Sequence, residues 1–251
     1  MKSNTNAKNS AIAGGSVMTW AGKIEITAGP AGVRTAEIPQ WSQTERTSPN
    51  GIGAIILQPD GDADALRHLG QALTELDEYF RGKRREFTVA LDPLGSEFYQ
   101  RSWAEVARVP FGETRSYGEI AHIIGAPAAV RAVGAANGAN PVAPFVPCHR
   151  IVGSDGRLTG YGPGLPLKAR LLAMEGAIPG DADSYDTWVD TLRARNGGKS
   201  PVLGLRGLGR YCTPGCARSR TRWTLPPRIF TSAELADAAG YFPCPQCRGQ
   251  R

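Results

Sequence analysis

The chain has 251 residues, and its hydrophobic content of 41% is enough for a sizeable core in one to three domains. It contains no uninterrupted apolar run of the ~18 residues that a membrane-spanning helix needs. The opening residues MKSNTNAKNSAIAGG also lack the apolar stretch of a signal peptide. We therefore expect a globular cytoplasmic protein that has no membrane partner.

The net charge of +6 is concentrated near the C-terminus. From Arg193 to Arg251 there are eleven Lys or Arg against two acidic residues, a net +9, whereas residues 1–192 carry a net −3. A segment this basic suits a polyanionic partner, because neutralised phosphates release condensed counterions. A solvated basic surface without a partner is the alternative.

The N-terminal third predicts a flexible tail followed by a small α/β domain, residues 17–93. Residues 1–16 are mostly polar, a composition typical of a flexible tail. Three runs rich in β-branched residues, separated by Gly-Pro and Ser-Pro-Asn-Gly turns, predict short strands. They are KIEITAG at 23–29, VRTAEI at 33–38 and GIGAIIL at 51–57.

A helix and a further strand complete this predicted domain. In DADALRHLGQALTELDEYF, residues 62–80, Leu and Phe recur every three or four residues, the spacing of one helix face. Asp62 or Asp64 is placed to cap the first turn of this helix. FTVAL, residues 87–91, predicts another strand.

From Ser96 the pattern becomes helical, and residues 94–180 are expected to form a second domain. Phe98, Trp103 and Val106 mark a first helix, and two short helices follow it. The short helices are SYGEIAHII at 116–124 and PAAVRAVGAANG at 127–138, a candidate helix-turn-helix.

The last of these helices has an unusual composition. Its exposed face would consist mostly of Ala and Gly, with Arg131 as its only charged side chain. A helix with so little bulk on its surface can approach another backbone closely. The alternative is a buried helix packed against its neighbours.

PFVPCHRIVG, residues 144–153, places a thiol next to an imidazole on a segment stiffened by two prolines. A thiol reacts as its thiolate, and a neighbouring His can take the proton, so that Cys148 and His149 are a candidate nucleophile and base. A metal ligand and a buried core cysteine are the two alternatives for Cys148.

Four further cysteines lie near the C-terminus in two short pairs, CTPGC and CPQC. Two such pairs can hold a tetrahedral zinc ion at ~2.3 Å through four thiolates, and in a cytoplasmic protein they argue for a metal rather than for disulfides. We therefore expect one zinc ion and no organic cofactor. The expected ligands are Cys212, Cys216, Cys244 and Cys247.

The motifs GETRSYGEIA, RAVGAANGANP, VPCHRIVGSDG, LTGYGPG and LLAMEG follow one another in this order. Together they resemble the O6-alkylguanine-DNA alkyltransferases, over roughly residues 17–178 and most densely over 112–176. The resemblance implies an α+β protein. It would have a ribonuclease H-like α/β N-terminal domain and a winged-helix-like alkyltransferase domain with a helix-turn-helix.

The resemblance also implies a single-turnover repair reaction, in which the alkyl group of O6-alkylguanine moves to a cysteine. O4-methylthymine is a second candidate substrate. Cys148 would be the acceptor, His149 its base through a bound water, and Glu175 the carboxylate that orients His149. Asn140 would brace the turn that carries the acceptor, and Tyr117 would contact the flipped base.

Double-stranded DNA is the partner that the resemblance implies, bound through its minor groove by a monomer that associates with the nucleoid. O6 of guanine lies inside the base stack, so the nucleotide has to be extruded at a cost of a few kcal/mol. Arg131 would fill the space that the base leaves. Further DNA contacts are implied for Ala129, Ala135, Gly138 and Tyr161.

A non-catalytic, lesion-recognising relative of these proteins is the alternative function. In such a protein the acceptor cysteine is replaced. The intact set of Cys148, His149 and Glu175 favours catalysis. Because transfer to sulfur gives a thioether without an easy leaving group, the catalytic protein would act once.

GRYCTPGC and RIFTSAELADAAGYFPCPQCR resemble the metal-binding domain of Ada-type adaptive-response proteins, over about residues 188–248. This resemblance implies that Cys212, besides holding zinc, accepts a methyl group from DNA methylphosphotriesters. A purely structural zinc is the alternative. Residues 181–251 are thus expected to comprise the linker DADSYDTWVDTLRARNGGKSP and this zinc domain.

Overall fold

The computed structural model describes residues 12–41, 56–57, 62–181, 184–222 and 225–248. Contacts divide the chain into two compact units. The N-terminal unit comprises Met1–Ala107, Ala135–Cys148 and Tyr161–Leu167, and the C-terminal unit comprises Arg108–Gly134, His149–Gly160 and Lys168–Arg251. The chain therefore passes between the units several times.

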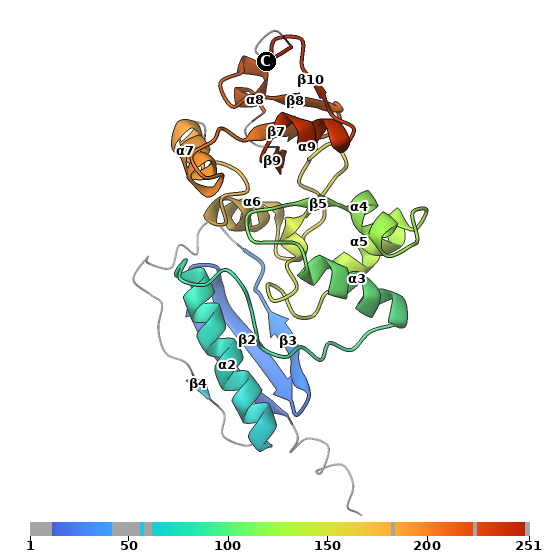
Figure 1. Cartoon of the computed structure of the whole chain (residues 1–251). Helices are drawn as coiled ribbons and strands as arrows, with labels where there is room; N and C mark the ends of the chain where they lie inside the picture. Colours follow the sequence, from blue (N-terminus) through green and yellow to red (C-terminus); the bar gives the residue numbers. More distant parts are fainter. Residues whose placement is uncertain (1–11, 42–55, 58–61, 182–183, 223–224, 249–251) are drawn as a thin grey trace, which may run out of the picture. The chain divides into compact units, whose positions relative to one another are not determined.

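The N-terminal unit is built on an antiparallel sheet with strand order β3-β2-β1-β4. Helix α2 (Ala63–Phe80) packs against β1, β2 and β3 (Figure 1). The strands are β1 (Ala13–Thr19), β2 (Gly22–Gly29), β3 (Gly32–Glu37) and β4 (Ile56–Leu57). The predicted strands at 23–29 and 33–38 and the predicted helix are confirmed, with Asp62 as its cap. Residues 51–55 lie outside the described residues.

Strand β1 corrects the predicted tail of residues 1–16, because it begins at Ala13. It pairs with β2 along its whole length, from Ala13 opposite Ala28 to Thr19 opposite Gly22. The sequence AGGSVMT is rich in small residues that are uncommon in strands, so composition gave no signal. Pairing and the complete burial of Val17 override that propensity.

The strand predicted at 87–91 is wrong, because a side chain satisfies the amides of Thr88 and Val89, and only Ala90 and Asp92 form backbone hydrogen bonds with Val33 of β3. The amides of Thr88 and Val89 donate to Oε2 of Glu75, at 2.9 and 3.2 Å. Leu91 alone forms an isolated bridge, with Val33. A buried carboxylate on α2 thus holds this segment in an irregular path.

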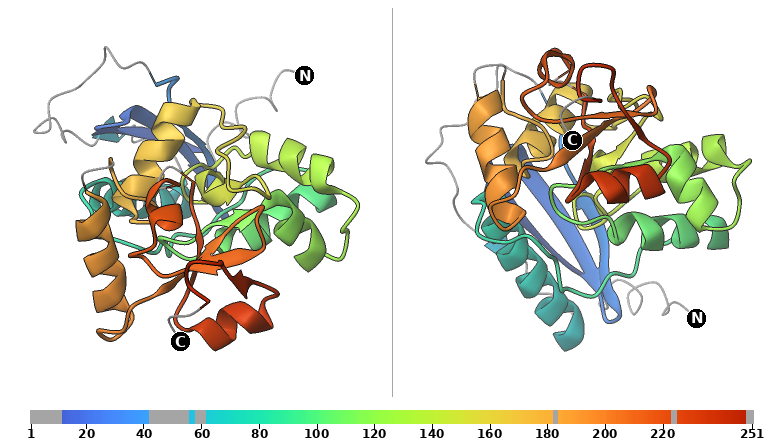
Figure 2. Two further views of the ribbon diagram at one scale, coloured as in Figure 1. Left: turned by 90° about the horizontal axis from the view of Figure 1, so that it is seen from above. Right: turned by 45° about the horizontal axis from the view of Figure 1, so that its top comes forward.

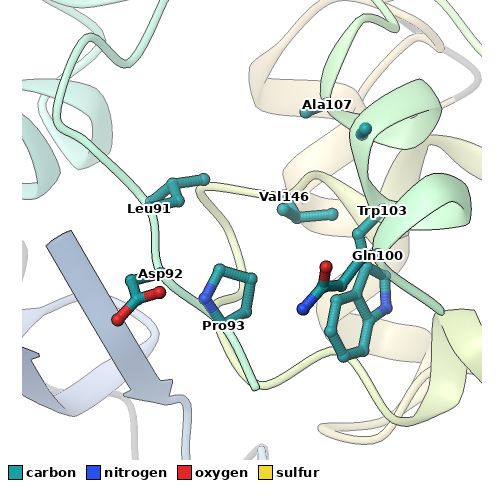
Figure 3. A pocket seen from close by; sticks show the side chains of 8 residues that line it. Leu91, Asp92, Pro93, Gln100, Trp103, Ala107 and Val146 are labelled. Carbon is teal, nitrogen blue, oxygen red and sulfur yellow. The ribbon is translucent and has the colours of Figure 1, made fainter. Parts of the chain in front are cut away.

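Helix α3 (Glu97–Ala107) confirms the first predicted helix of the second domain. The indole nitrogen of its buried Trp103 donates to the carbonyl of Ala136 at 2.7 Å. A pocket of about 290 Å³ lies beside it. Figure 3 shows Leu91 and Pro93 of this pocket facing Gln100 and Trp103. None of the residues predicted to react or to bind DNA lines this pocket.

The first part of the C-terminal unit contains α4, a short parallel pair of strands and α6. Ser116 and Glu119 form a reciprocal capping box at the start of α4, with hydrogen bonds of 3.1 and 2.7 Å. Along the chain the elements are β5 (Arg115–Ser116), α4 (Tyr117–Ile123), α5 (Val130–Gly138), η1 (Cys148–Arg150), β6 (Ile151–Val152) and α6 (Leu165–Met174), of which α5, η1 and α6 have residues in both units. Both short helices predicted from the sequence are therefore confirmed, α5 beginning three residues later than predicted.

Residues 181–201 are not simply a linker, because most of them form helix α7 (Tyr185–Arg195). Tyr185, Trp188, Val189 and Leu192 are buried. Their spacing of three, one and three residues is that of one helix face, but the Gly-Gly and Ser-Pro pairs near the end of the segment indicated a linker. The helix lies beside a small sheet of the same unit (Figure 2).

This small sheet has strand order β10-β8-β7-β9. The strands of this sheet and the two helices between them along the chain are β7 (Val202–Leu205), β8 (Arg210–Cys212), α8 (Ala217–Arg220), β9 (Arg228–Phe230), α9 (Ala233–Ala238) and β10 (Phe242–Pro243). We call residues 202–248 the four-cysteine module. In the described part of the chain, no helix has the length and apolar character needed to cross a bilayer.

Candidate functional site

Cys148 lies at a pocket of about 320 Å³ in the N-terminal unit, where it is 5% exposed. The pocket size falls within the range of small-ligand sites. The pocket is lined by Ala36, Glu37, Ile38, Gln40, Asn137, Gly138, Asn140, Pro141, Ala143, Cys148, Tyr161, Gly162 and Pro163. The structure therefore brings together four of the residues predicted from the sequence: Cys148, Asn140, Gly138 and Tyr161.

Two asparagines hold the turn that carries Cys148. Asn140 donates to the carbonyl of Val146 at 2.8 Å and accepts from the amide of Val142 at 3.1 Å. Asn137, buried on α5, donates to the carbonyl of Cys148 itself at 3.2 Å. Asn140 was predicted from the sequence and Asn137 was not, although an Asn in a helix of Ala and Gly is a signal.

The far wall of this pocket is held by the segment that follows β3. The side chain of Gln40 donates to the carbonyl of Gly162 at 2.8 Å. The amide of Trp41 donates to the carbonyl of Pro163 at 3.1 Å. These contacts fix the loop that carries Tyr161, and no sequence pattern reveals them because the partners are over 120 residues apart.

His149 directly follows Cys148 and belongs to the C-terminal unit. Its Nε2 atom lies 2.8 Å from Oε1 of Glu175, and both side chains are fully buried. Burial lowers the pKa of His149 and outweighs the Glu175 carboxylate, which raises it. The imidazole is therefore neutral at neutral pH and can accept a proton.

Arg150 is a second partner of Glu175 and was not among the predicted site residues, although it stands in the PCHR motif. Its Nε and Nη2 atoms donate to both carboxylate oxygens, each at 2.9 Å, and its Nη1 atom donates to the carbonyl of Val109 at 2.6 Å. Burial alone would raise the pKa of Glu175, but His149 and Arg150 hold it well below its usual range. Glu175 is therefore a carboxylate with a fixed orientation.

Tyr117 lies at the start of α4, and its hydroxyl donates to the carbonyl of Thr159 at 3.2 Å. The fully buried Lys168 donates to the same carbonyl at 2.7 Å and to that of Ile151. These contacts tie α4 and β6 to the loop before Tyr161. All of these contacts lie within the C-terminal unit. The contact between Tyr117 and a flipped base stays a prediction.

Helix α5 has the exposed face that its sequence predicts. Arg131, Ala132, Ala135 and Gly138 are exposed, whereas Val133 is fully buried. Ala129, just before the helix, is half-buried. The exposed side of α5 therefore combines one guanidinium group with small residues that leave its backbone accessible.

The four cysteines of the module form one cluster, whose sulfur atoms all lie within 4.8 Å of one another. The sulfurs of Cys216 and Cys244 are 3.8 Å apart, far longer than a disulfide bond. A tetrahedral zinc ion with bonds of ~2.3 Å requires sulfur atoms about 3.8 Å apart, so the cluster fits such an ion. Cys212 and Cys244 are fully buried, and Cys216 is 9% exposed.

Several arginines of the basic segment form ion pairs with acidic residues of the C-terminal unit. Arg206 and Arg228 face Glu119, at 2.7 and 3.7 Å, and Arg220 pairs with Asp186 at 2.6 Å. Part of the positive charge is thus neutralised locally. The whole excess of +9 is therefore not available to a polyanion.

The sequence profile for the DNA-binding domain of 6-O-methylguanine DNA methyltransferase matches residues 97–177. A methylated-DNA–protein-cysteine methyltransferase of Mycolicibacterium paratuberculosis is 56% identical over 109 residues, 43% of this chain and 66% of that protein. The protein of that name from Mycobacterium bovis is 53% identical over 116 residues, 46% of this chain and 70% of that protein. The chain belongs to the O6-methylguanine DNA methyltransferase family.

Solved structures of methyltransferases agree with this assignment. Mycobacterium tuberculosis OGT, solved in complex with DNA, is 40% identical with a TM-score of 0.51, covering 64% of this chain and 90% of that one. The family comprises DNA repair methyltransferases that bind DNA, and the relatives come from bacteria and archaea. Helix α7 and the four-cysteine module follow the residues that the family profile matches.

Proposed function

We propose that the protein repairs O6-alkylguanine in double-stranded DNA by moving the alkyl group to Cys148, once per chain. The observation that carries the proposal is an intact thiol at a pocket of base-binding size, followed directly by an imidazole that a buried carboxylate holds at 2.8 Å. The similarity to a methyltransferase solved with DNA supports the same partner.

The proposed reaction begins with transfer of the Cys148 proton to His149 through one bound water. Glu175 stabilises the imidazolium ion that results. The thiolate sulfur then attacks the alkyl carbon, a carbon–sulfur bond forms, and the bond from that carbon to O6 breaks. The guanine leaves with the electron pair and regains one proton, so the products are a thioether and unmodified guanine.

Access to O6 requires the nucleotide to leave the base stack, at a cost of a few kcal/mol. We propose that α5 enters the minor groove with its face of small residues, and that Arg131 occupies the space left by the base. Ala135 and Gly138 would allow close approach to the sugar-phosphate backbone. Tyr117 and Tyr161 are the proposed contacts of the extruded base.

Intact-mass analysis after incubation with O6-methylguanine duplex tests this function. The wild-type chain should gain one methyl group in place of hydrogen, and peptide mapping should place it on Cys148. Cys148→Ala should gain none and still bind the duplex. Tight binding without any gain of mass by the wild-type chain would instead indicate a non-catalytic lesion-binding protein.

For the module we propose a structural zinc ion held by Cys212, Cys216, Cys244 and Cys247. Bound zinc would supply a cross-link between β8, α8 and the turn after β10. Methyl transfer from a phosphotriester would require Cys212 to reach DNA, but its side chain is fully buried. Metal analysis should give one zinc per chain, and peptide mapping after exposure to methylphosphotriester DNA should find Cys212 unmodified.

A further inference from the structure

We propose that the segment following the family match, residues 185–248, is a positioning part of the alkyl-transfer site. In this arrangement α7 holds the backbone of Glu175, and the four-cysteine module holds α7. The inference rests on the proposed function, and it assigns a role in O6-alkylguanine repair to a part of the chain that the family profile does not include.

Two side chains of α7 bond to the backbone just after α6. The indole nitrogen of Trp188 donates to the carbonyl of Gly176 at 2.9 Å. Nη2 of Arg195 donates to the carbonyl of Glu175 at 3.3 Å. Because α6 ends at Met174, these bonds fix the two peptide units that determine where the Glu175 carboxylate lies.

Arg195 is packed closely against the backbone at Gly112 and Gly176 of the C-terminal unit. A Cβ atom at Gly112 would lie 2.8 Å from both Nη1 of Arg195 and the carbonyl oxygen of Glu175. A Cβ atom at Gly176 would lie 3.2 Å from Nη2 of Arg195. Two glycines thus leave just enough room for this guanidinium group, and the amide of Gly112 also donates to the Glu175 carboxylate at 3.4 Å.

Helix α7 is in turn held by the four-cysteine module. Trp188 and Leu192 share a buried cluster with Leu203 of β7, which pairs with Cys212 of β8. The hydroxyl of Tyr185 donates to the carbonyl of Pro214, between Cys212 and Cys216, at 3.2 Å. A metal ion that joins the four cysteines therefore stabilises the surface against which α7 packs.

The module has a second attachment near the reacting residues. Arg206 is 4% exposed, and its guanidinium group donates to Glu119 and to the carbonyl of Thr114, both at 2.7 Å. Its neighbour Leu205 packs against the four cysteines. Thr114 directly precedes β5, which pairs with β6 immediately after η1, so this attachment also supports the strand that follows His149 and Arg150.

The test compares Arg195→Ala with Arg193→Ala, a substitution on the same helix that removes only an exposed ion pair with Asp190. Because each chain reacts once, the final methyl count measures the folded, active fraction, and the rate measures positioning. Arg195→Ala should reach the wild-type count with a rate about tenfold to hundredfold lower. Arg195→Lys, which keeps one donor, should recover part of the rate.

The imidazole signal of His149 in NMR titrations gives a second readout that does not depend on transfer. Glu175 raises the pKa of His149, so a displaced carboxylate should move its titration to lower pH in Arg195→Ala. Zinc removal from the full chain by a chelator should cause the same shift and slow transfer, and zinc addition should reverse both. Arg193→Ala should behave as the wild type.

An unchanged rate together with an unchanged His149 titration, in both Arg195→Ala and the chelated protein, would overturn the proposal. If Arg195→Ala lowers the methyl count because it unfolds, Arg195→Lys and the chelated wild type still decide the matter. A wild-type chain that accepts no methyl group would refute the proposed function instead, and the His149 titrations would continue to test whether α7 positions Glu175.

Discussion

Replacing Glu175 with Gln tests the centre of the proposed mechanism. The carboxylate accepts hydrogen bonds from Nε and Nη2 of Arg150 and from the amide of Gly112, and it faces Nε2 of His149. Gln has the same shape but no charge, and its amide group presents donors to the donors of Arg150. The substitution therefore leaves a buried guanidinium ion without its counter-charge.

The expected loss of stability is about 3–5 kcal/mol, the typical cost of removing one partner from a buried ion pair. Such a loss is a large part of the 5–15 kcal/mol that stabilises a typical domain. Alkyl transfer should slow by about 10²–10⁴-fold in the folded fraction, because His149 loses the carboxylate that orients it and stabilises its charge.

Urea unfolding and the single-turnover rate are the two measurements, and Glu113→Gln is the matched control. Glu113 is exposed and pairs with Arg115 at 3.1 Å on the surface, where ion pairs contribute at most about 1 kcal/mol. A loss below 1 kcal/mol for Glu175→Gln, with a transfer rate near that of the control, would refute the role assigned to this carboxylate.

Four further predictions concern pH, DNA and the backbone. The pKa values of His149 and Glu175 are both lowered in the folded state, so their contribution to stability is complete above pH ~6.5 and declines as pH falls, which acid titration of unfolding would show. The transfer rate should likewise stay constant from pH 8 to ~6.5 and fall only below it; a fall that begins above pH 7 would contradict a neutral His149. Arg131→Ala should slow repair of duplex DNA far more than attack on free O6-methylguanine, and equal losses would exclude a role in base extrusion. Gly112→Ala should cost at least about 1–2 kcal/mol, because Gly112 has φ +79° and its Cβ would crowd Glu175; a neutral effect in urea unfolding would contradict this close packing.

The candidate site could be predicted in large part because its residues stand in short motifs. Cys148 and His149 are adjacent, and Glu175 ends a recognisable run, so the chemistry of each residue type was visible without coordinates. The structure adds Arg150 and Asn137, whose roles depend on where a side chain points. Sequence patterns give the face on which a residue lies but not the atom that it contacts.

The fold was predictable wherever periodicity and composition agree, as in α2. It was not predictable where a tertiary contact replaces a regular one. At Thr88 and Val89 a β-rich run forms no strand, because Glu75 satisfies its amides. In α7 the helical spacing was present, but its importance comes from Trp188 and Arg195, whose partners lie in another part of the chain.

The distribution of charge in the module bears on what this segment contributes. Arg206 is buried against Glu119, and Arg220 forms two hydrogen bonds with Asp186 on α7, at 2.6 and 2.8 Å. Both arginines thus attach the module to the rest of the C-terminal unit. The fully buried Cys212 is also directed to the interior of this unit. With Arg206 and Arg220 bonded to the rest of this unit and Cys212 buried, the module is better suited to supporting the neighbouring reaction than to carrying out a second one.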